Sequence, residues 1–308
     1  MKKGLIIFLV LSDLFVFGQQ IPQYTQWSWH QMALNPAHAG IKKCVDIHTL
    51  ARTQWVGFEG APKSGLFTLS VPLNSKRKQF LSARHGLGLK FEKDAIGQFD
   101  VNRINAAYAA HFNFNVENRL SLGVYAGAVQ MGYNPSQVTT TVPDPVAQNE
   151  GSFVAPDASF GAWYNSTNYY VGFTMQQLIP NKWNGIGEQA KNRIHNSISA
   201  GYQYGVNSKL SLLPALLLKF PPRGTASFDL SLQMDYQNVL GVGLGYRSSD
   251  ALLVFFQLKI KEQFSVGYTF DYTLSKIQVG AQNTHEVSLR FTSCKPQKNA
   301  SYSCPLFD

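Results

Sequence analysis

The stretch Leu34–Leu73, LNPAHAGIKKCVDIHTLARTQWVGFEGAPKSGLFTLSVPL, decides the fold of this chain. Two runs within it, Cys44–Arg52 and Leu66–Pro72, alternate between apolar and polar residues. Such alternation is typical of β-strands with one buried face. The connection between them, Thr53–Gly65, holds glycines that let a chain reverse its direction. The stretch therefore predicts a β-hairpin with a long connection.

The connection is rich in large, stiff side chains. Trp55, Phe58 and Pro62 lie in it beside three glycines. Such side chains either pack to hold the loop in shape or anchor a binding partner. Strand formation does not explain these side chains, because they lie between strands. A loop with only a structural role would not need this much apolar area facing water, because exposed apolar area lowers solubility. We expect the connection to be a recognition surface or a plug folded into the molecule.

Alternating runs continue along the rest of the chain. In Phe264–Thr273, large apolar residues occupy every second position, with small or polar residues between them. Runs of this kind are about as long as the 9–11 residues that a tilted strand needs to cross a bilayer. The fourteen runs begin near Val45, Leu66, Gly86, Asp100, Arg119, Ala155, Tyr169, Ile194, Lys209, Ser227, Val239, Ala251, Gln263 and Thr284. An even number of strands can close into a barrel without a free edge.

The composition favours the same architecture. Only 15% of the residues are charged and 13% are aromatic, whereas about a quarter of the residues of a soluble domain are charged. No stretch after the N-terminal region has the roughly 18 apolar residues of a transmembrane helix. We therefore predict an all-β fold, a transmembrane antiparallel β-barrel of about 14 strands. The predicted barrel is formed by residues 45–292 and lies in the outer membrane.

The two ends of the chain differ from the barrel region. Residues 1–18 have Lys2 and Lys3 ahead of an apolar run, and Gly18 precedes a plausible cleavage point at Gln19; this arrangement is typical of a secretory signal peptide. Its removal takes away two lysines and Asp13, so the net charge falls from +9 to +8. We expect residues 19–44 to form a periplasmic segment, either free or folded into the barrel mouth, and residues 293–308 to form a periplasmic tail.

The lengths of the connections predict the orientation of the barrel. Short connections follow even-numbered runs, as around Asn207-Ser208 and Gln237-Asn238, and the longest, Gly132–Val154, follows an odd-numbered run. Outer-membrane barrels have short periplasmic turns and longer outer loops. Both termini are then periplasmic, with a long connection at Pro72–Arg84 and a short one at Ser248–Asp250 as exceptions.

The basic charge does not indicate nucleic-acid binding. The positive residues are scattered, with only short runs at Lys42-Lys43 and Lys76–Lys78, so no basic stripe exists to follow a phosphate backbone. Contact with acidic lipid headgroups of the outer membrane is the better explanation. Inward-facing charges are expected to pair with one another, or to line a channel or a seat for an inserted segment: Asp229, Asp235, Asp271, Lys259 and Arg290.

Motifs for catalysis, metals and cofactors are missing from the sequence. The histidines have no standard ligand spacing, and no GxSxG motif is present. We expect no catalytic, metal or cofactor-binding residues. Cys294 and Cys304 lie in the polar tail and are expected to form a disulfide, whereas Cys44 is expected to be a small buried residue.

The last run contains the pair His285-Glu286. As neighbours on a strand, the two side chains point to opposite faces. Either His285 faces inward and Glu286 outward, or the reverse. We expect the pair to fix the strand register or to contact a partner.

Several of these residues together resemble the PorP/SprF family of type IX secretion membrane proteins, found in the outer membrane of Bacteroidota. The matching residues are Leu34-Asn35-Pro36-Ala37, Ala39-Gly40, Arg52, Gln54–Phe58, Gly60-Ala61-Pro62, Pro156-Asp157, Gly172-Phe173, Pro180 and Thr284–Leu289. The resemblance implies a partner-binding barrel of the type IX secretion and gliding motility machinery. It would anchor, or help to export, a secreted cargo protein or adhesin C-terminal domain at the cell surface, together with periplasmic or lipoprotein components.

The candidate partner-binding residues come from the connection and from the matching motifs. They are Trp55, Phe58, Pro62, Gln54, Asn35, Pro36, Asp157, His285 and Glu286. A channel or transporter for a small solute is the alternative function, and an outer-membrane enzyme has the least support. Ion conduction in planar bilayers would indicate a channel, and copurification with a large adhesin would indicate an anchor.

Overall fold

The computed structural model describes residues 21–73, 82–133, 151–182, 191–221 and 225–294. The strands are β1 (Asp46–Thr53), β2 (Lys63–Leu73), β3 (Arg84–Ile96), β4 (Phe99–Asn113), β5 (Arg119–Tyr133), β6 (Gly151–Asn165), β7 (Tyr169–Gln176), β8 (His195–Tyr202), β9 (Tyr204–Asn207), β10 (Leu210–Phe220), β11 (Ser227–Tyr236), β12 (Leu240–Arg247), β13 (Ala251–Lys261), β14 (Phe264–Thr273) and β15 (Thr284–Thr292). The helical segments are η1 (Thr25–Ser28), α2 (Gln31–Leu34), η2 (Pro36–His38) and η4 (Lys276–Val279).

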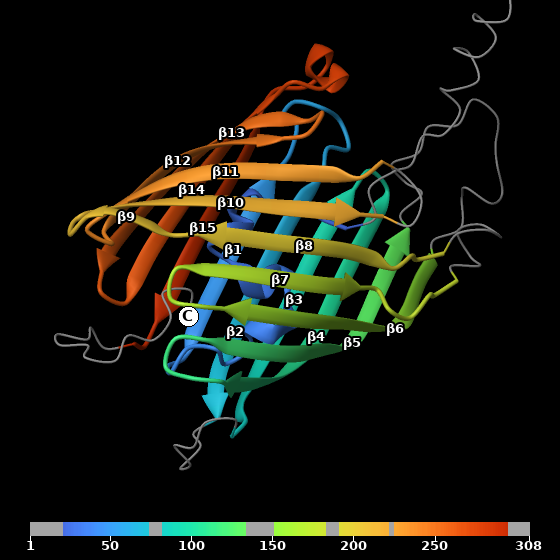
Figure 1. Cartoon of the computed structure of the whole chain (residues 1–308). Coiled ribbons are helices and arrows are strands. Elements are labelled where there is room, and N and C mark those ends of the chain that lie inside the picture. The colour runs from blue at the N-terminus through green and yellow to red at the C-terminus, as the bar shows by residue number, and fades with distance from the viewer. Residues whose placement is uncertain (1–20, 74–81, 134–150, 183–190, 222–224, 295–308) are drawn as a thin grey trace, which may run out of the picture.

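The strands form one antiparallel sheet that closes on itself (Figure 1). β1 pairs with both β2 and β15, and β10 pairs with β11, which completes the ring. β8 and β9 both pair with β10 and are separated only by Gln203, so they are two halves of one barrel strand. The predicted all-β barrel of 14 strands is confirmed.

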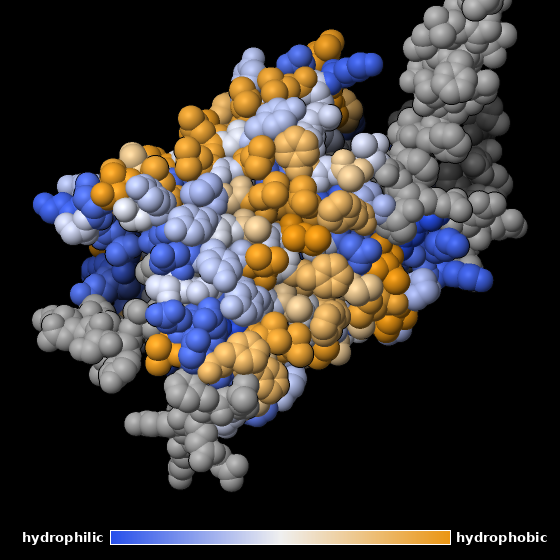
Figure 2. Space-filling model, viewed as in Figure 1, coloured by the Kyte–Doolittle hydropathy of each residue, from blue (hydrophilic) through white to orange (hydrophobic). Residues whose placement is uncertain are grey.

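The alternation in the sequence becomes the two faces of the barrel wall. On β4, Val101, Arg103 and Asn105 are buried towards the lumen, whereas Ile104 is 52% exposed and Tyr108 is 44% exposed on the outside. Successive side chains of a strand point to opposite faces. Figure 2 shows the apolar residues spread over the outer wall, with hydrophilic residues gathered towards its ends. None of the helices in the described ranges is long and apolar enough to cross a membrane.

The lengths of the connections divide the barrel into two ends. Short turns at residues 114–118, 166–168, 208–209, 237–239 and 262–263 lie at the end where β1 begins and β15 stops. Because outer-membrane barrels carry short turns on the periplasmic side, we call this the periplasmic end and the opposite one the outer end. Most connections at the outer end are longer, with tight turns at 97–98 and 248–250 as exceptions. Residues 134–150 of the long predicted loop lie outside the described residues.

Residues 21–43 lie inside the barrel, where Figure 1 shows them as blue helical turns behind the front strands. We call this segment the N-terminal plug. It packs so closely against the wall that inward positions there are glycines. A Cβ added at Gly123 would lie 2.5 Å from the backbone nitrogen of Ala37, and one at Gly86 or Gly161 would collide with the plug as well. The wall is therefore shaped to the backbone of the plug.

This close approach gives a test of the plug's contribution to stability. Gly123→Ala should lower the free energy of unfolding by about 1–3 kcal/mol, the usual cost of overpacking a tight contact. The loss of stability is measured as a shift in the urea concentration at which half of the protein has lost the gel mobility of the folded barrel. Gly65→Ala is the matched control, because nothing lies within 4 Å of a Cβ at Gly65. Equal midpoints for the two variants would show that the plug is not held against β5.

Candidate functional site: the plugged lumen and the outer loop

The N-terminal plug crosses the lumen from the outer end to the periplasmic end. Near its start, Gln23 accepts a hydrogen bond from Lys219, close to the outer end of β10, over 3.0 Å. Near its end, the backbone N–H of Gly40 donates to Ser70, in the periplasmic half of β2, over 2.7 Å. Trp27 between them is fully buried. The expected periplasmic segment, residues 19–44, is thus inside the barrel from residue 21 onward, because its polar and aromatic side chains find partners on the wall.

A cluster of buried charges lines the outer half of the lumen. Arg52 of β1 pairs with Asp271 of β14 over 2.9 Å and with Glu286 of β15 over 3.2 Å. Arg247 of β12 pairs with Asp271 over 3.2 Å and with Asp229 of β11 over 3.3 Å. All five side chains are at most 2% exposed. Removing one partner from such a network leaves an uncompensated buried charge, which costs about 3–5 kcal/mol.

The first helical turn of the plug binds to this cluster through neutral groups. The backbone N–H groups of Thr25 and Gln26 donate to the Glu286 carboxylate over 2.9 and 2.8 Å. The Thr25 hydroxyl donates to Asp271 over 2.7 Å and accepts from Arg52 and Arg247. One carboxylate thus satisfies two N–H groups that the short η1 turn leaves without helical partners.

The Asn35-Pro36-Ala37 motif anchors the middle of the plug. The Asn35 side chain accepts from the backbone N–H of Ala37 over 2.9 Å, which caps η2, and Pro36 occupies its first turn. The Asn35 amide donates to the carbonyls of Ala162 on β6 and Phe173 on β7 over 3.0 and 3.2 Å. Asn35 and Pro36, which we expected to contact a partner, are buried inside the barrel and joined to two strands.

Three wall side chains hold carbonyl oxygens of the plug. Lys90 donates to the Ala33 carbonyl over 2.9 Å, Tyr125 donates to the Met32 carbonyl, and His111 lies 3.0 Å from the Ala39 carbonyl. Short helices leave such carbonyls unpaired. The wall thus replaces the hydrogen bonds that longer helices would make internally.

The loop 54–62 at the outer end connects β1 to β2 and is fixed on both sides. The backbone N–H of Trp55 donates to the Thr284 hydroxyl over 3.1 Å, and Val56 exchanges backbone hydrogen bonds with residues 282 and 283. On the other side, the N–H of Gly97 donates to the Gly60 carbonyl over 2.9 Å. The loop is therefore held by the β14–β15 connection and by the β3–β4 turn.

The predicted anchors of this loop differ in exposure. Phe58 is 46% exposed, whereas Gln54 is 7% exposed and Pro62 is buried. Trp55 is half-buried and adopts a φ of 50°, which is uncommon for a residue other than glycine. Phe58 is thus the large apolar side chain of this loop that is exposed to solvent.

The remaining predicted partner residues lie on the barrel wall. Asp157 is 5% exposed in the lumen and accepts from the Asn105 amide over 3.0 Å. Glu286 faces inward and is fully buried, whereas His285 lies on the outer surface, 2.8 Å from the Tyr268 hydroxyl. Of the two orientations that we left open for this pair, the structure adopts the one with Glu286 inside.

The residues that complete the charge cluster were not predicted from the sequence. Arg247 is the last residue of a strand whose other inward positions are glycine, and Thr25 belongs to the segment that we expected to be periplasmic or folded into the barrel mouth. Arg52 was noted only as part of the family resemblance. The strand alternation that placed Asp229 and Asp271 inward also places Arg247 inward, so that signal was available.

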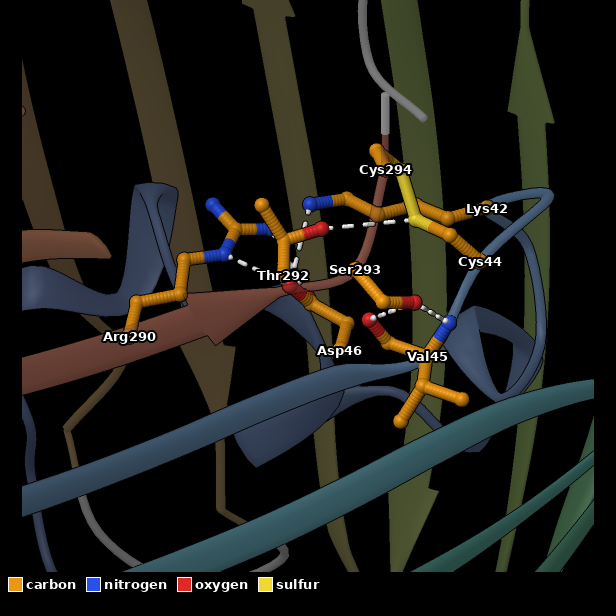
Figure 3. The surroundings of a disulfide bond; sticks show 8 residues. All are labelled: Lys42, Cys44, Val45, Asp46, Arg290, Thr292, Ser293 and Cys294. Atoms are coloured by element: carbon orange, nitrogen blue, oxygen red, sulfur yellow. Dashed lines mark hydrogen bonds and ion pairs between the residues drawn. A yellow bond between two sulfur atoms is a disulfide. The ribbon is translucent and has the colours of Figure 1, made fainter. Parts of the chain in front are cut away.

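The disulfide joins Cys44 to Cys294, so the expected pairing of Cys294 with Cys304 is wrong (Figure 3). Cys304 lies outside the described residues. The β1–β15 register pairs Asp46 with Thr292, and its continuation brings Cys44 opposite Cys294 with a Cα–Cα distance of 5.1 Å. A neighbouring backbone pair, Val45 and Ser293, extends the ladder. Closure of the barrel thus unites two cysteines that are 250 residues apart.

Mass spectrometry of the unreduced protein should find the Cys44 and Cys294 peptides linked. Cys44→Ser should lower the free energy of unfolding by an amount on the order of 2–4 kcal/mol, because the bond restricts the unfolded chain. Cys304→Ser serves as the control and should leave both the link and the stability unchanged. A Cys294–Cys304 link in the folded protein would contradict this assignment.

The course of the plug predicts the side on which its first residues emerge. An epitope tag inserted before Ile21 should bind antibody on intact cells, because Gln23 lies at the outer end of the lumen. A tag in the 114–118 turn is the control and should bind only after the outer membrane is permeabilised. Gel mobility verifies that both proteins fold. Protection of the first tag in intact cells would show that the plug enters from the other side.

Comparisons with known proteins agree with the barrel. The sequence model of the type IX secretion system membrane protein PorP/SprF matches residues 16–291. No curated protein matches the chain. Similar solved structures include a Pseudomonas aeruginosa FadL homologue, at 12% identity and a TM-score of 0.50, covering 89% of this chain and 95% of that one.

Two further similar structures are named as transport proteins. The CymD monoaromatic hydrocarbon channel has 10% identity and a TM-score of 0.51 over 92% of this chain and 96% of that one. The Ralstonia pickettii toluene transporter TbuX has 10% identity and a TM-score of 0.52 over 85% and 92%. Identities this low establish the fold alone. Because the family match spans nearly the whole chain, this outer-membrane barrel belongs to the PorP/SprF family of type IX secretion system membrane proteins.

Proposed function

We propose that the barrel binds partner proteins and anchors, or helps to export, a secreted cargo or adhesin C-terminal domain at the cell surface, with periplasmic or lipoprotein components of the type IX secretion and gliding machinery. The N-terminal plug is the observation that carries the proposal. It runs through the lumen from Gln23 at the outer end to Gly40 near the periplasmic end. A barrel occupied in this way is suited to present surfaces to other proteins.

The loop 54–62 supports binding on the outer side. Its backbone is fixed by hydrogen bonds on both flanks, so little conformational entropy is lost when a partner binds. Phe58 projects from it with 46% of its surface exposed. Rigid aromatic side chains of this kind often dominate the binding energy of an interface. We assign Phe58 as the main contact and Trp55 as a second contact that also shapes the loop.

Capture of the secreted partner by purified barrel tests this assignment. Phe58→Ala should weaken capture by about 2 kcal/mol, roughly thirtyfold, because it removes an anchor without disturbing the backbone hydrogen bonds of the loop. Heat-modifiable mobility should stay that of the parent, since the register of β1 and β2 does not involve Phe58. A pull-down titration of the cargo C-terminal domain gives the affinity.

Phe114→Ala is a matched control for loss of exposed aromatic area. Phe114 is 47% exposed but lies in the 114–118 turn at the periplasmic end. It should leave capture of a cell-surface cargo unchanged. Equal affinities for the parent and Phe58→Ala would remove the loop from the interface, and an unfolded Phe58→Ala protein would make the side chain structural.

A further inference from the structure

A cavity of about 230 Å³ lies in the lumen beside the N-terminal plug. On one side the plug lines it with His30, Gln31 and His38, and on the other Gln233 and Gln257 project from the wall. Towards the periplasmic end the cavity meets Lys42, Asp46 and Arg290, whose side chains are 15–23% exposed. These three side chains are only partly buried, so the periplasmic end is the more open end of the cavity.

Three buried plug residues that line this cavity have an unpartnered polar atom. Within the described ranges, the Nδ1 of His30, the Oε1 of Gln31 and the Nε2 of His38 make no hydrogen bond. The residues are only 3%, 8% and 9% exposed. An unsatisfied buried polar group costs about 1–3 kcal/mol, and a water or a ligand in the adjoining cavity would supply the missing partners.

The opposite ends of two of these side chains are already fixed. The Nε2 of His30 lies 2.7 Å from the Thr68 hydroxyl, and the Nε2 of Gln31 donates to the Tyr170 hydroxyl over 3.2 Å. Each side chain is thus held in place while its remaining polar atom stays unpaired. This is the arrangement of a preformed polar binding site, in which a few fixed groups orient a ligand.

The lining specifies the chemistry of the occupant. It contains two basic side chains, Lys42 and Arg290, and two acidic ones, Asp46 and Asp235, so it has no net formal charge and does not favour an ion. No group of three or more potential metal ligands occurs in the described residues. The Gln233 Oε1 accepts from the indole N–H of Trp29, which leaves its NH₂ group as a donor, and the Gln257 amide offers both a donor and an acceptor.

A hydroxyl group both donates and accepts, which matches a lining of amides and imidazoles. The cavity has room for several waters or for one small solute. We propose that it binds a small, neutral, polyhydroxylated molecule of about monosaccharide size that enters from the periplasmic end. This site is separate from the outer loop proposed for cargo capture, so either assignment can fail without the other.

Calorimetric titration of the folded barrel in detergent with glycerol and with D-glucose tests the proposal. Saturable binding is expected, with a change in tryptophan emission because Trp29 and Trp163 line the cavity. Gln31→Met removes the unpaired acceptor at similar volume, and Leu213→Trp fills the cavity from the wall. Each variant should weaken binding about tenfold or more. Gln31→Met does so because one buried hydrogen bond is lost, and Leu213→Trp because the space for the ligand is lost.

Thr269→Val is the matched control. Thr269 also has a buried, unpartnered hydroxyl in the described structure, but it does not line the cavity. Loss of this hydroxyl should leave the affinity for the polyols unchanged. The proposal is overturned if neither polyol binds saturably, which would mean that the cavity holds water only. It is equally overturned if Gln31→Met and Leu213→Trp bind as the parent does, or if toluene binds in place of the polyols.

Discussion

The contact between Glu286 and the backbone of the first plug turn is the interaction on which the arrangement of the lumen depends. A carboxylate inside a closed barrel is costly unless it is paired and hydrogen-bonded. Glu286 meets this need with Arg52 on one side and with the N–H groups of Thr25 and Gln26 on the other. The plug turn has the complementary need, because its N–H groups are buried away from water.

The charges in the outer half of the wall are largely paired with one another, and the first plug turn adds only neutral groups to them. Arg52, Arg247 and Lys219 face Asp229, Asp271 and Glu286, three basic residues against three acidic ones. These residues come from β1, β10, β11, β12, β14 and β15, so the cluster extends across the seam where the first strand meets the last. Arg52 and Glu286 join that seam near the outer end, and the Cys44–Cys294 disulfide joins it at the periplasmic end.

The barrel could be predicted from the sequence because strand alternation is a local signal. The predicted beginnings of β2 and β6 were late, at Leu66 and Ala155 rather than Lys63 and Gly151. β2 begins with the polar or small residues Lys63, Ser64 and Gly65, whereas Phe153 and Val154 at the start of β6 were assigned to the preceding connection. The disulfide could not be predicted in the same way. Cys304 is close to Cys294 in sequence, whereas Cys44 becomes its neighbour only when β1 pairs with β15. The exposure of Phe58 and the burial of Pro62 likewise depend on the neighbouring connections.

Polar inward positions alone do not distinguish a water-filled lumen from a plugged one, because both satisfy polar side chains. Inward glycines carry more information, since a lumen filled by water has no need for missing side chains. Gly86, Gly123 and Gly161 each face the plug, where a Cβ would collide with its atoms. The inward glycines of β12 have another cause, because at Gly243 and Gly245 the nearest side chains belong to Gln233 and Phe255 on neighbouring wall strands. An inward glycine thus indicates a plug only where no side chain of a neighbouring wall strand covers its Cβ position. Recognising such positions requires the strand order as well as the sequence.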